Sequence, residues 1–217
     1  MRLTLRTEAL SILLLLASWA LVLWFWPQLP DPMPTHWGAN GLPDGWMPRA
    51  WGAIVGPLAA TLTYLVMTAS PYLDPRYRNW AAFADLYPVL KSGVCALMLY
   101  ITYLALSAAS SPDQALPITR VMIGLGLLFV VLGNYLPKVR SNFFVGIRTP
   151  WTLSSDDVWT RTHRFAGKLM VVLGIALTAG TWLPSNWALG LVLGSTFGVT
   201  LLTVGYSYWL YRRQARD

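Results

Sequence analysis

Six long apolar segments separated by polar loops dominate the sequence. A helix needs about 20 apolar residues to cross the roughly 30 Å hydrocarbon core of a bilayer. Because lipid offers no hydrogen-bond partner to the backbone, each segment must be helical. The pattern therefore predicts an all-α, polytopic integral membrane bundle of about six transmembrane helices. The segments are 9–26, 50–70, 86–108, 118–136, 169–183 and 187–211.

The fifth segment is short for a membrane span, and the residues before it predict how it is lengthened. Ser154 or Ser155 is suited to an N-cap, and Asp156 and Asp157 would complement the helix dipole in the first turn. We therefore expect a helix to begin there and to continue into the span. Five of its side chains then share one helical face: Trp159, Thr162, His163, Ala166 and Met170.

Composition agrees with a membrane protein. Of the 217 residues, 55% are hydrophobic and 12% are charged, and the mean hydropathy is +0.48. Soluble domains carry about 25% charged residues. The net charge of +7 is compatible with nucleic-acid binding, but the positions of the basic residues favour a role in membrane topology, so we expect no direct nucleic-acid contact. A single cysteine, Cys95, cannot form a disulfide framework.

The basic residues gather in alternate loops. With six spans, one side of the membrane receives Arg2, Arg6, Arg76, Arg78, Lys138, Arg140, Arg148, Arg161, Arg164, Lys168, Arg212, Arg213 and Arg216. The other side receives Arg49 and Arg120. The positive-inside rule then places both termini in the cytoplasm. The loop between the first two spans (28–50), the loop "SSPDQALP" and the short loop 184–186 should face outward.

The first outer loop contains "DPMPTHWGANGLPDGW", residues 31–46. Its prolines restrict the backbone, and Asn40-Gly41 and Asp44-Gly45 are turn formers suited to positive φ. We expect a stiff loop that holds His36 in place and binds a ligand or partner. The alternative is that His36 satisfies only local backbone groups. The candidate binding residues are Pro34, His36, Asn40, Gly41, Asp44 and Trp46.

We expect no cofactor and no metal in this loop. One His and two Asp are fewer than the three or four ligands that a metal site uses. His36 is the one candidate ligand.

A second informative loop lies on the expected cytoplasmic side, at residues 133–168. Pro137 ends the fourth span, residues 141–148 should be extended, and Thr149-Pro150 should break that stretch. We expect a re-entrant or interfacial hairpin with Trp151 and Trp159 at the level of the lipid headgroups. The alternative is a plain basic connector. The candidate functional residues are Asn134, Lys138, Asn142, Gly146, Arg148, Thr149, Pro150, Trp151, Thr152, Trp159, Thr162 and His163.

Three of these side chains lead to a mechanistic hypothesis. We expect Arg148, Asn142 and His163 to converge beneath the bundle and to hold this loop in one conformation. Within the spans, Lys91 is the charged residue that stands out, and near the inner end of its span it can reach the interface by snorkelling. The lack of a chain of buried carboxylates argues against an ion-coupled transporter.

Catalysis has little support in the sequence. No nucleophile is paired with a base in a recognised motif, and HExxH, GxSxG and Gly-rich phosphate loops are missing. We therefore expect a protein that is not an enzyme. A membrane enzyme with its site at the 133–168 loop, or a small transporter or channel, remain the alternatives.

Two stretches together resemble a known family. The stretch "PMPTHWGANGLPDGW" resembles the P-x-P-x-H…G-x-P-D-G signature of a small membrane domain of uncharacterised role. The stretch "GNYLPKVRSNFFVGIRTPWTLSSDDVWTRTHRFAGK" is similar to the signature of the SdpI family of bacterial immunity proteins. The resemblance implies two domains, a two-span domain at 1–84 and an SdpI-like four-span domain at 85–217.

The same resemblance implies a location and a role. It implies a multi-pass protein of the bacterial inner (plasma) membrane, surrounded by the lipid bilayer. The family role is protection against a secreted peptide toxin, joined to capture of a cytoplasmic repressor of the ArsR type. The partners expected from it are a peptide toxin outside the cell and this repressor inside.

Overall fold

The computed structural model describes residues 4–111, 113–182 and 185–214. Five residues of the topology prediction therefore lie outside the described residues: Arg2, Pro112, Leu183, Pro184 and Arg216. Six helices are long and apolar enough to cross a membrane, which confirms the polytopic helical bundle. The helices are α1 (Leu5–Phe25), α2 (Arg49–Leu73), α3 (Tyr87–Ser110), α4 (Ile118–Tyr135), the short α5 (Pro150–Ser154), α6 (Asp156–Ala179) and α7 (Ser185–Gln214).

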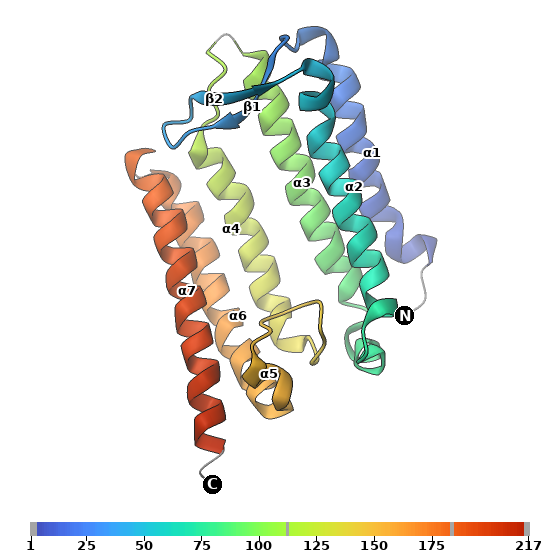
Figure 1. Ribbon diagram of the computed structural model, residues 1–217, viewed down its shortest axis with the longest axis vertical. Helices are drawn as coiled ribbons and strands as arrows, with labels where there is room; N and C mark the ends of the chain where they lie inside the picture. Colours follow the sequence, from blue (N-terminus) through green and yellow to red (C-terminus); the bar gives the residue numbers. More distant parts are fainter. Residues whose placement is uncertain (1–3, 112, 183–184, 215–217) are drawn as a thin grey trace.

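The helices form two groups that lie side by side (Figure 1). One group contains α1, α2 and α3, and the other contains α4, α6 and α7, with α3 and α4 in contact between them. Strands β1 (Met33–Trp37) and β2 (Pro43–Met47) lie across one end of the bundle, which we call the hairpin end. Helix α5, the loop before it and the first and last described residues lie at the opposite end, which we call the basic end.

The lengthened fifth helix is confirmed. Helix α6 begins at Asp156, and the Ser155 hydroxyl accepts a hydrogen bond from Val158 N as its N-cap. The predicted helical face is the buried one, because Trp159, Thr162 and His163 are all enclosed. Thr149 caps the additional helix α5 in the same way, through Thr152 N, and the sequence reading missed that helix.

Glycines let α4 and α6 approach closely. A Cβ atom on Gly174 would lie 2.4 Å from the carbonyl oxygen of Gly126, and one on Gly133 would lie 2.6 Å from that of Gly167. Small residues allow helix backbones to meet in this way in membranes. The second pair lies about two helical turns from the first.

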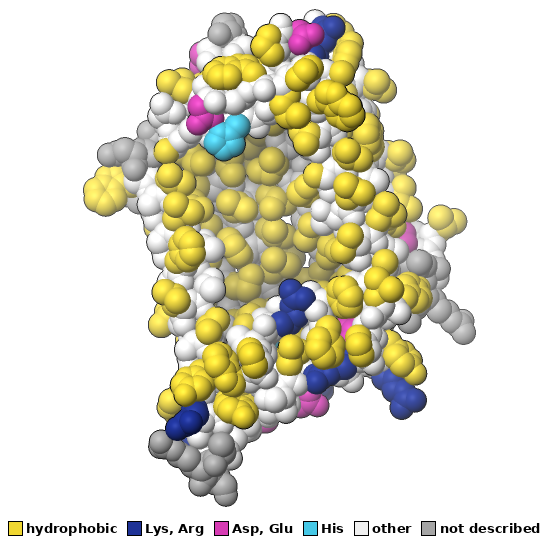
Figure 2. Space-filling model, in the orientation of Figure 1, with side chains coloured by type: hydrophobic (Ala, Val, Ile, Leu, Met, Phe, Trp, Pro, Cys, Tyr) yellow, Lys and Arg dark blue, Asp and Glu magenta, His cyan; other side chains and the backbone are white. Residues whose placement is uncertain are grey.

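Charge is distributed unevenly between the two ends. Figure 2 shows dark blue basic side chains gathered toward the basic end and yellow apolar side chains along the flanks. The described basic residues at the hairpin end are Arg49 and Arg120. This distribution supports the expected topology, with the basic end in the cytoplasm, and the orientation itself stays a prediction.

Further 3-10 turns complete the described chain. They connect the main helices or extend their ends, and their bounds are Trp26–Gln28, Tyr77–Phe83, Leu136–Lys138 and Gly180–Trp182. The proposed division at residue 84 stays a prediction. In the structure α3, which follows that boundary, packs against both α1 and α2, which precede it.

Candidate functional site

The stiff loop between the first two spans is a two-stranded antiparallel hairpin. Met33 pairs with Met47, Pro34 with Trp46, and His36 with Gly45, with irregular register on both sides of His36. Gly41 has a φ of +77°, as its place after Asn40 predicts. The second predicted turn is wrong: Gly45 lies within β2 rather than at positive φ. A Cβ atom there would lie 3.0 Å from the Cβ of His36, so glycine allows the strands to approach.

Three hydrogen bonds fix the hairpin to the bundle. Leu116 N donates to the carbonyl oxygen of Gly41 at 2.9 Å, and Trp37 Nε1 donates to that of Gln114 at 2.7 Å. These two hydrogen bonds join the hairpin to the loop between α3 and α4. At the other side, Arg49 N donates to Asp31 Oδ1 at 3.2 Å. The hairpin is therefore anchored at its tip and at its base.

His36 and Asp44 form a side-chain pair on the exposed surface of the hairpin. The distance from His36 Nδ1 to Asp44 Oδ1 is 2.5 Å, and the side chains are 75% and 52% exposed. Since a carboxylate only accepts, Nδ1 carries the proton. In the neutral ring, Nε2 is then an acceptor. Asn40 does not join the pair, because its Oδ1 accepts from Leu42 N at 3.0 Å. The described residues contain no group of three metal-binding side chains here or elsewhere.

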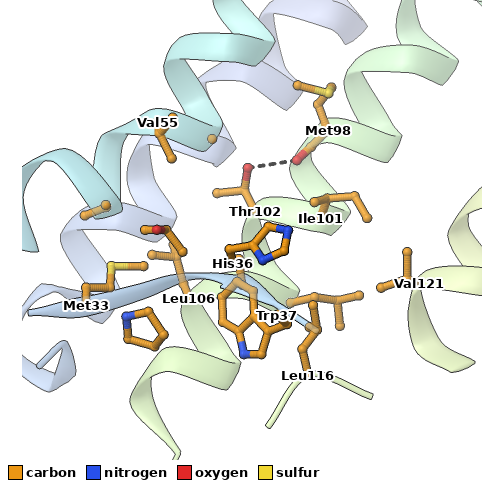
Figure 3. Close-up of a pocket in the computed structure, with 17 residues that line it drawn as sticks. Met33, His36, Trp37, Val55, Met98, Ile101, Thr102, Leu106, Leu116 and Val121 are labelled. Carbon is orange, nitrogen blue, oxygen red and sulfur yellow. Dashed lines mark hydrogen bonds between the residues drawn. The ribbon is translucent and has the colours of Figure 1, made fainter. Parts of the chain in front are cut away.

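An apolar cavity of about 340 Å³ lies directly beneath the hairpin. Met33, His36 and Trp37 of β1 border it on one side, and Figure 3 shows them facing residues of α2, α3 and α4. The other walls come from Val55 of α2, from Met98, Ile101, Thr102 and Leu106 of α3, from Leu116 of the α3–α4 loop, and from Val121 of α4. The Thr102 hydroxyl donates to its own helix, at Met98 O, so the walls offer little free polar surface.

The structure divides the candidate residues of the hairpin. Pro34 and His36 border the cavity, and Asp44 lies behind His36 as its partner. Asn40 and Gly41 shape the tip of the hairpin. Trp46 is 50% exposed and is not part of the cavity wall. The α3 and α4 residues of the wall were missed, because nothing in an apolar span marks which side faces a cavity.

At the basic end, one asparagine organises the loop between α4 and α5. Asn142 is fully buried, and its side chain makes four hydrogen bonds to the backbone. Its Nδ2 donates to Arg140 O at 2.8 Å and to Val145 O at 3.0 Å, and its Oδ1 accepts from Phe144 N at 2.8 Å and Val145 N at 2.7 Å. The loop is consequently a compact turn. The expectation of an extended segment at 141–148 is wrong. The Asn142 side chain forms the hydrogen bonds to the loop backbone that a neighbouring strand would otherwise provide.

His163 fixes the same loop from the side of α6. Its Nε2 accepts a hydrogen bond from Ile147 N at 3.0 Å, so Nδ1 carries the proton and donates to Trp159 O at 2.8 Å. The ring stacks on Trp159 with centroids 4.0 Å apart. Gly146 lies against it with a φ of +112°, and a Cβ atom there would lie 2.4 Å from His163 Nε2. Glycine is therefore required at this position by both conformation and space.

Arg148 and Thr152 also bind this loop. Arg148 Nη1 donates to Phe143 O at 2.5 Å, and the Thr152 hydroxyl donates to Ile147 O at 2.8 Å. The three side chains of the mechanistic hypothesis therefore converge on one stretch of backbone rather than on one another. Arg148, Asn142 and His163 do not touch one another by any hydrogen bond in the described residues, but all three bind the backbone of residues 140–147.

The other candidates at this end make separate contacts, except Trp159, which stacks on His163. Trp159 is 1% exposed and its Nε1 donates to Val139 O, so its expected position among lipid headgroups is wrong. The Trp151 ring packs against that of Tyr208 of α7 in a tilted arrangement, with centroids 5.0 Å apart. Asn134 bonds to its own helix at Val130 O, and Lys138 lies over the ring of Tyr135. The exposed Pro150 begins α5.

A buried aspartate and an arginine were missed by the sequence reading. Asp74 is 3% exposed, and its Oδ2 accepts from Trp80 Nε1 at 3.0 Å and from Phe143 N at 2.9 Å. Arg76 donates to the Ser141 hydroxyl and to Leu153 O. These contacts tie the α2–α3 connection to the α4–α5 loop. The signal in the sequence, Asp-Pro-Arg directly after a span, is too short to identify a partner more than 60 residues away.

The prediction that Lys91 snorkels is also wrong. Its side chain is 1% exposed and binds Glu8 of α1. The argument against a transporter considered one charged residue within the spans, and the structure encloses Glu8 of α1 beside it.

Comparisons with known proteins agree with this arrangement. Residues 138–207, which contain most of the basic-end site, match the SdpI/YfhL protein family. Residues 13–61, which contain the hairpin, match a domain of unknown function, DUF1648. The chain is also similar to the immunity protein SdpI of Bacillus subtilis (strain 168), with 21% identity over 208 residues, covering 96% of this chain and 97% of the relative.

The chain therefore resembles the SdpI family. The expected resemblance is therefore confirmed, and it extends over both predicted parts of the sequence. No solved structure matches the chain. The two sites described above are thus the hairpin of the DUF1648 region and the turn that opens the SdpI/YfhL region.

Proposed function

We propose that this SdpI-like protein is an immunity and sensor protein of the bacterial inner membrane. In this proposal a peptide toxin binds at the hairpin end, outside the cell, and a cytoplasmic repressor of the ArsR type binds at the basic end. The observation that carries it is the preformed apolar cavity of about 340 Å³ beneath the hairpin. The similarity of the whole chain to a protein named for immunity supports the same role.

The cavity suits an apolar part of a peptide. Ligand pockets commonly measure about 300–1,000 Å³ and are lined mainly by apolar groups with a few polar ones. Here the polar group at the rim is His36. The hydrogen bonds from Trp37, Leu116 and Arg49 hold the hairpin over the cavity before any ligand arrives. Such preorganisation reduces the entropy cost of binding.

The basic end offers a polar surface of a different kind. A cleft of about 650 Å³ lies between the α2–α3 connection and the start of α6. Its lining is rich in polar and basic groups: Pro75, Arg76, Tyr77, Arg78, Asn79, Leu153, Ser154, Ser155 and Asp156. We propose that the repressor docks over this cleft and over the turn organised by Asn142.

Helix α4 provides the physical connection between the two ends. Val121, near its start, borders the hairpin cavity, and its far end leads directly into the Asn142 turn. The glycine contacts with α6 make the two helices move as one packed unit. A shift of α4 on peptide binding would therefore change the position of the basic-end loop. Coupling of this kind requires an element with two arrangements.

A survival experiment tests the first half of the proposal. The chain is expressed in a bacterium that lacks SdpI proteins, and the cells are challenged with membrane-active peptides encoded beside its gene. Survival and membrane potential, followed with a potential-sensitive dye, should both be preserved. The Ala105→Phe variant fills the cavity and should lose protection.

The control for that variant is Ala179→Phe, which adds the same bulk to an exposed position of α6 away from the cavity. Both proteins must reach the membrane in equal amounts. Equal protection by the two variants would show that the cavity is not the binding site of the peptide. Absence of protection by the unaltered chain against every such peptide would overturn the immunity role.

Repressor capture is tested separately. An ArsR-type regulator encoded near the gene is fused to a fluorescent protein, and its membrane recruitment is measured with and without the peptide. Asn142→Ala removes all four backbone hydrogen bonds of the turn and should abolish recruitment. If the regulator stays in the cytoplasm while the chain still protects cells, the immunity role stands and the sensor role is wrong.

A further inference from the structure

We propose that the hairpin site recognises an ammonium group together with the apolar group that fills the cavity. The ligand would be a peptide whose free amino terminus, or a lysine, lies next to a large apolar side chain. The inference rests on the proposed function and specifies the ligand class of the same site. It comes from the pairing of Asp44 with His36, the residue of the pair that borders the cavity.

The pair leaves hydrogen-bond acceptors unused. With Nδ1 donating to Asp44 Oδ1, His36 retains the lone pair of Nε2 and Asp44 retains Oδ2, and neither atom has a hydrogen bond among the described residues. An ammonium group carries three N–H donors and no acceptor. The pair therefore offers an ammonium group both the hydrogen-bond acceptors that it needs and a negative charge.

Neighbouring cations do not neutralise Asp44. Among the described residues its only ionic partner is His36. The nearest arginine in sequence, Arg49, places its guanidinium over the ring of Trp26, 4.9 Å from the centroid. Asp31 and Asp113 add further negative charge to this end of the molecule, although each already accepts a backbone hydrogen bond. The carboxylate of Asp44 would itself repel a ligand carboxylate and attract an ammonium group.

The cavity sets the size of the apolar group. An engineered cavity of about 150 Å³ binds benzene. The volume beneath the hairpin is about 340 Å³, which accommodates a phenylalanine side chain with space for a neighbouring aliphatic group. His36 belongs both to the cavity wall and to the exposed pair, so the ammonium and the apolar group must be close together in the ligand. An amino-terminal residue followed by apolar side chains meets that requirement.

The two histidines of the chain make the test direct. The full-length protein is labelled with ¹⁵N-histidine and placed in phosphatidylcholine nanodiscs, and the ring signals are followed by NMR. The probes are Leu-Phe amide, which has a free amino terminus, and its N-acetyl derivative, which has none. We expect the free amine to shift the His36 signals in a saturable way. The buried His163 should not respond, and acetylation should weaken binding at least about tenfold.

Matched variants locate the charge. Asp44→Asn keeps the shape of the side chain but removes its charge, and it should weaken binding of the free amine at least about tenfold. Asp113→Asn removes a charge from the adjacent α3–α4 loop and should leave the affinity within about twofold. Equal binding of the two probes, no binding of either, or equal affinity in Asp44→Asn and the unaltered chain would each overturn the inference.

The outcome is separable from that of the survival experiment. A chain that protects cells but shows no preference for the free amine keeps the proposed function and loses this inference. A chain that binds the free amine through Asp44 but protects against no peptide keeps the site and loses the immunity role.

Discussion

Lys91 of α3 lies with its Nζ 2.6 Å from Glu8 Oε2 of α1, and both side chains are enclosed by the bundle. The hydroxyl of Tyr64, on α2, donates to the same carboxylate oxygen at 2.9 Å. The Lys91 ammonium also lies 5.4 Å from the centroid of the Tyr64 ring and 5.6 Å from that of Tyr87. One ion pair therefore joins the first three spans near the basic end.

Removal of either partner alone leaves an unpaired charge within the bundle. Loss of one member of a buried pair costs about 3–5 kcal/mol, whereas replacement of both is often neutral. We expect Lys91→Met to destabilise the protein by about that amount. The Glu8→Gln/Lys91→Met double variant should recover most of the loss, since Gln still accepts from Tyr64. Unfolding in detergent micelles, monitored by circular dichroism, measures both.

The matched control is Arg161→Met, which breaks an exposed pair with Asp157 at 3.6 Å. Exposed pairs of this kind contribute about 0–1 kcal/mol. If Lys91→Met cost no more than Arg161→Met, the enclosed pair would have no structural role. If the double variant were as unstable as the single one, the cost would come from lost packing rather than from an unpaired charge.

Features that depend on residues close together in the sequence were predicted, whereas contacts between distant residues were not. The six spans, the N-cap at Ser155 and the buried face of α6 depend on local patterns of side chains, and they are confirmed. Glycines within spans are typical of helix packing in membranes, but which of them meet, such as Gly126 and Gly174, is decided by the fold. The Glu8–Lys91 pair was missed because its partners are 83 residues apart.

Two local features were missed for other reasons. The prolines of the first loop indicated a restricted backbone but no strands, since proline is usually confined to strand edges and bulges. In a two-stranded ribbon, however, each strand has a free edge, and that restriction is relaxed. The compact turn at the basic end depends on Asn142, whose four hydrogen bonds are available only once Arg140 and Val145 have been brought together.

The second prediction concerns Gly146. Gly146→Ala would place a methyl group within 2.4 Å of His163 Nε2 at a φ of +112°, and both features are unfavourable for alanine. Strain of the backbone alone costs about 1–3 kcal/mol. We expect reduced stability, together with a changed NMR signal of the His163 ring, because its bond to Ile147 N must lengthen.

Gly190→Ala on α7 provides the comparison, because a Cβ atom there meets nothing within 4 Å. In a helix this change should stabilise by up to about 1 kcal/mol. Equal stability of the two alanine variants would show that the loop relaxes without cost and that His163 does not hold it.

The third prediction separates two buried threonines. Among the described residues Thr162 Oγ1 has no hydrogen-bond partner, whereas the Thr152 hydroxyl donates to Ile147 O at 2.8 Å and accepts from Thr149 N at 2.9 Å. Valine has the same shape as threonine but no hydroxyl. Thr152→Val should therefore cost about 1–3 kcal/mol, and Thr162→Val should be neutral or slightly stabilising. The two midpoints of thermal unfolding, measured in the same detergent, give the answer. A larger loss in Thr162→Val would reveal a bound water or a partner at that hydroxyl.

The fourth prediction concerns orientation in the membrane. Ala39, at the tip of the hairpin, and Ser154, at the end of α5, are both exposed and lie at opposite ends of the bundle. The basic residues at the Ser154 end predict that this end is cytoplasmic. In intact cells, a membrane-impermeant maleimide should therefore label Ala39→Cys but not Ser154→Cys, and permeabilised cells should label both. The native Cys95 is 2% exposed and serves as an internal negative control. Labelling of Ser154→Cys alone in intact cells would show that the orientation is the opposite of the predicted one. The hairpin cavity would then face the cytoplasm and could not meet a secreted peptide.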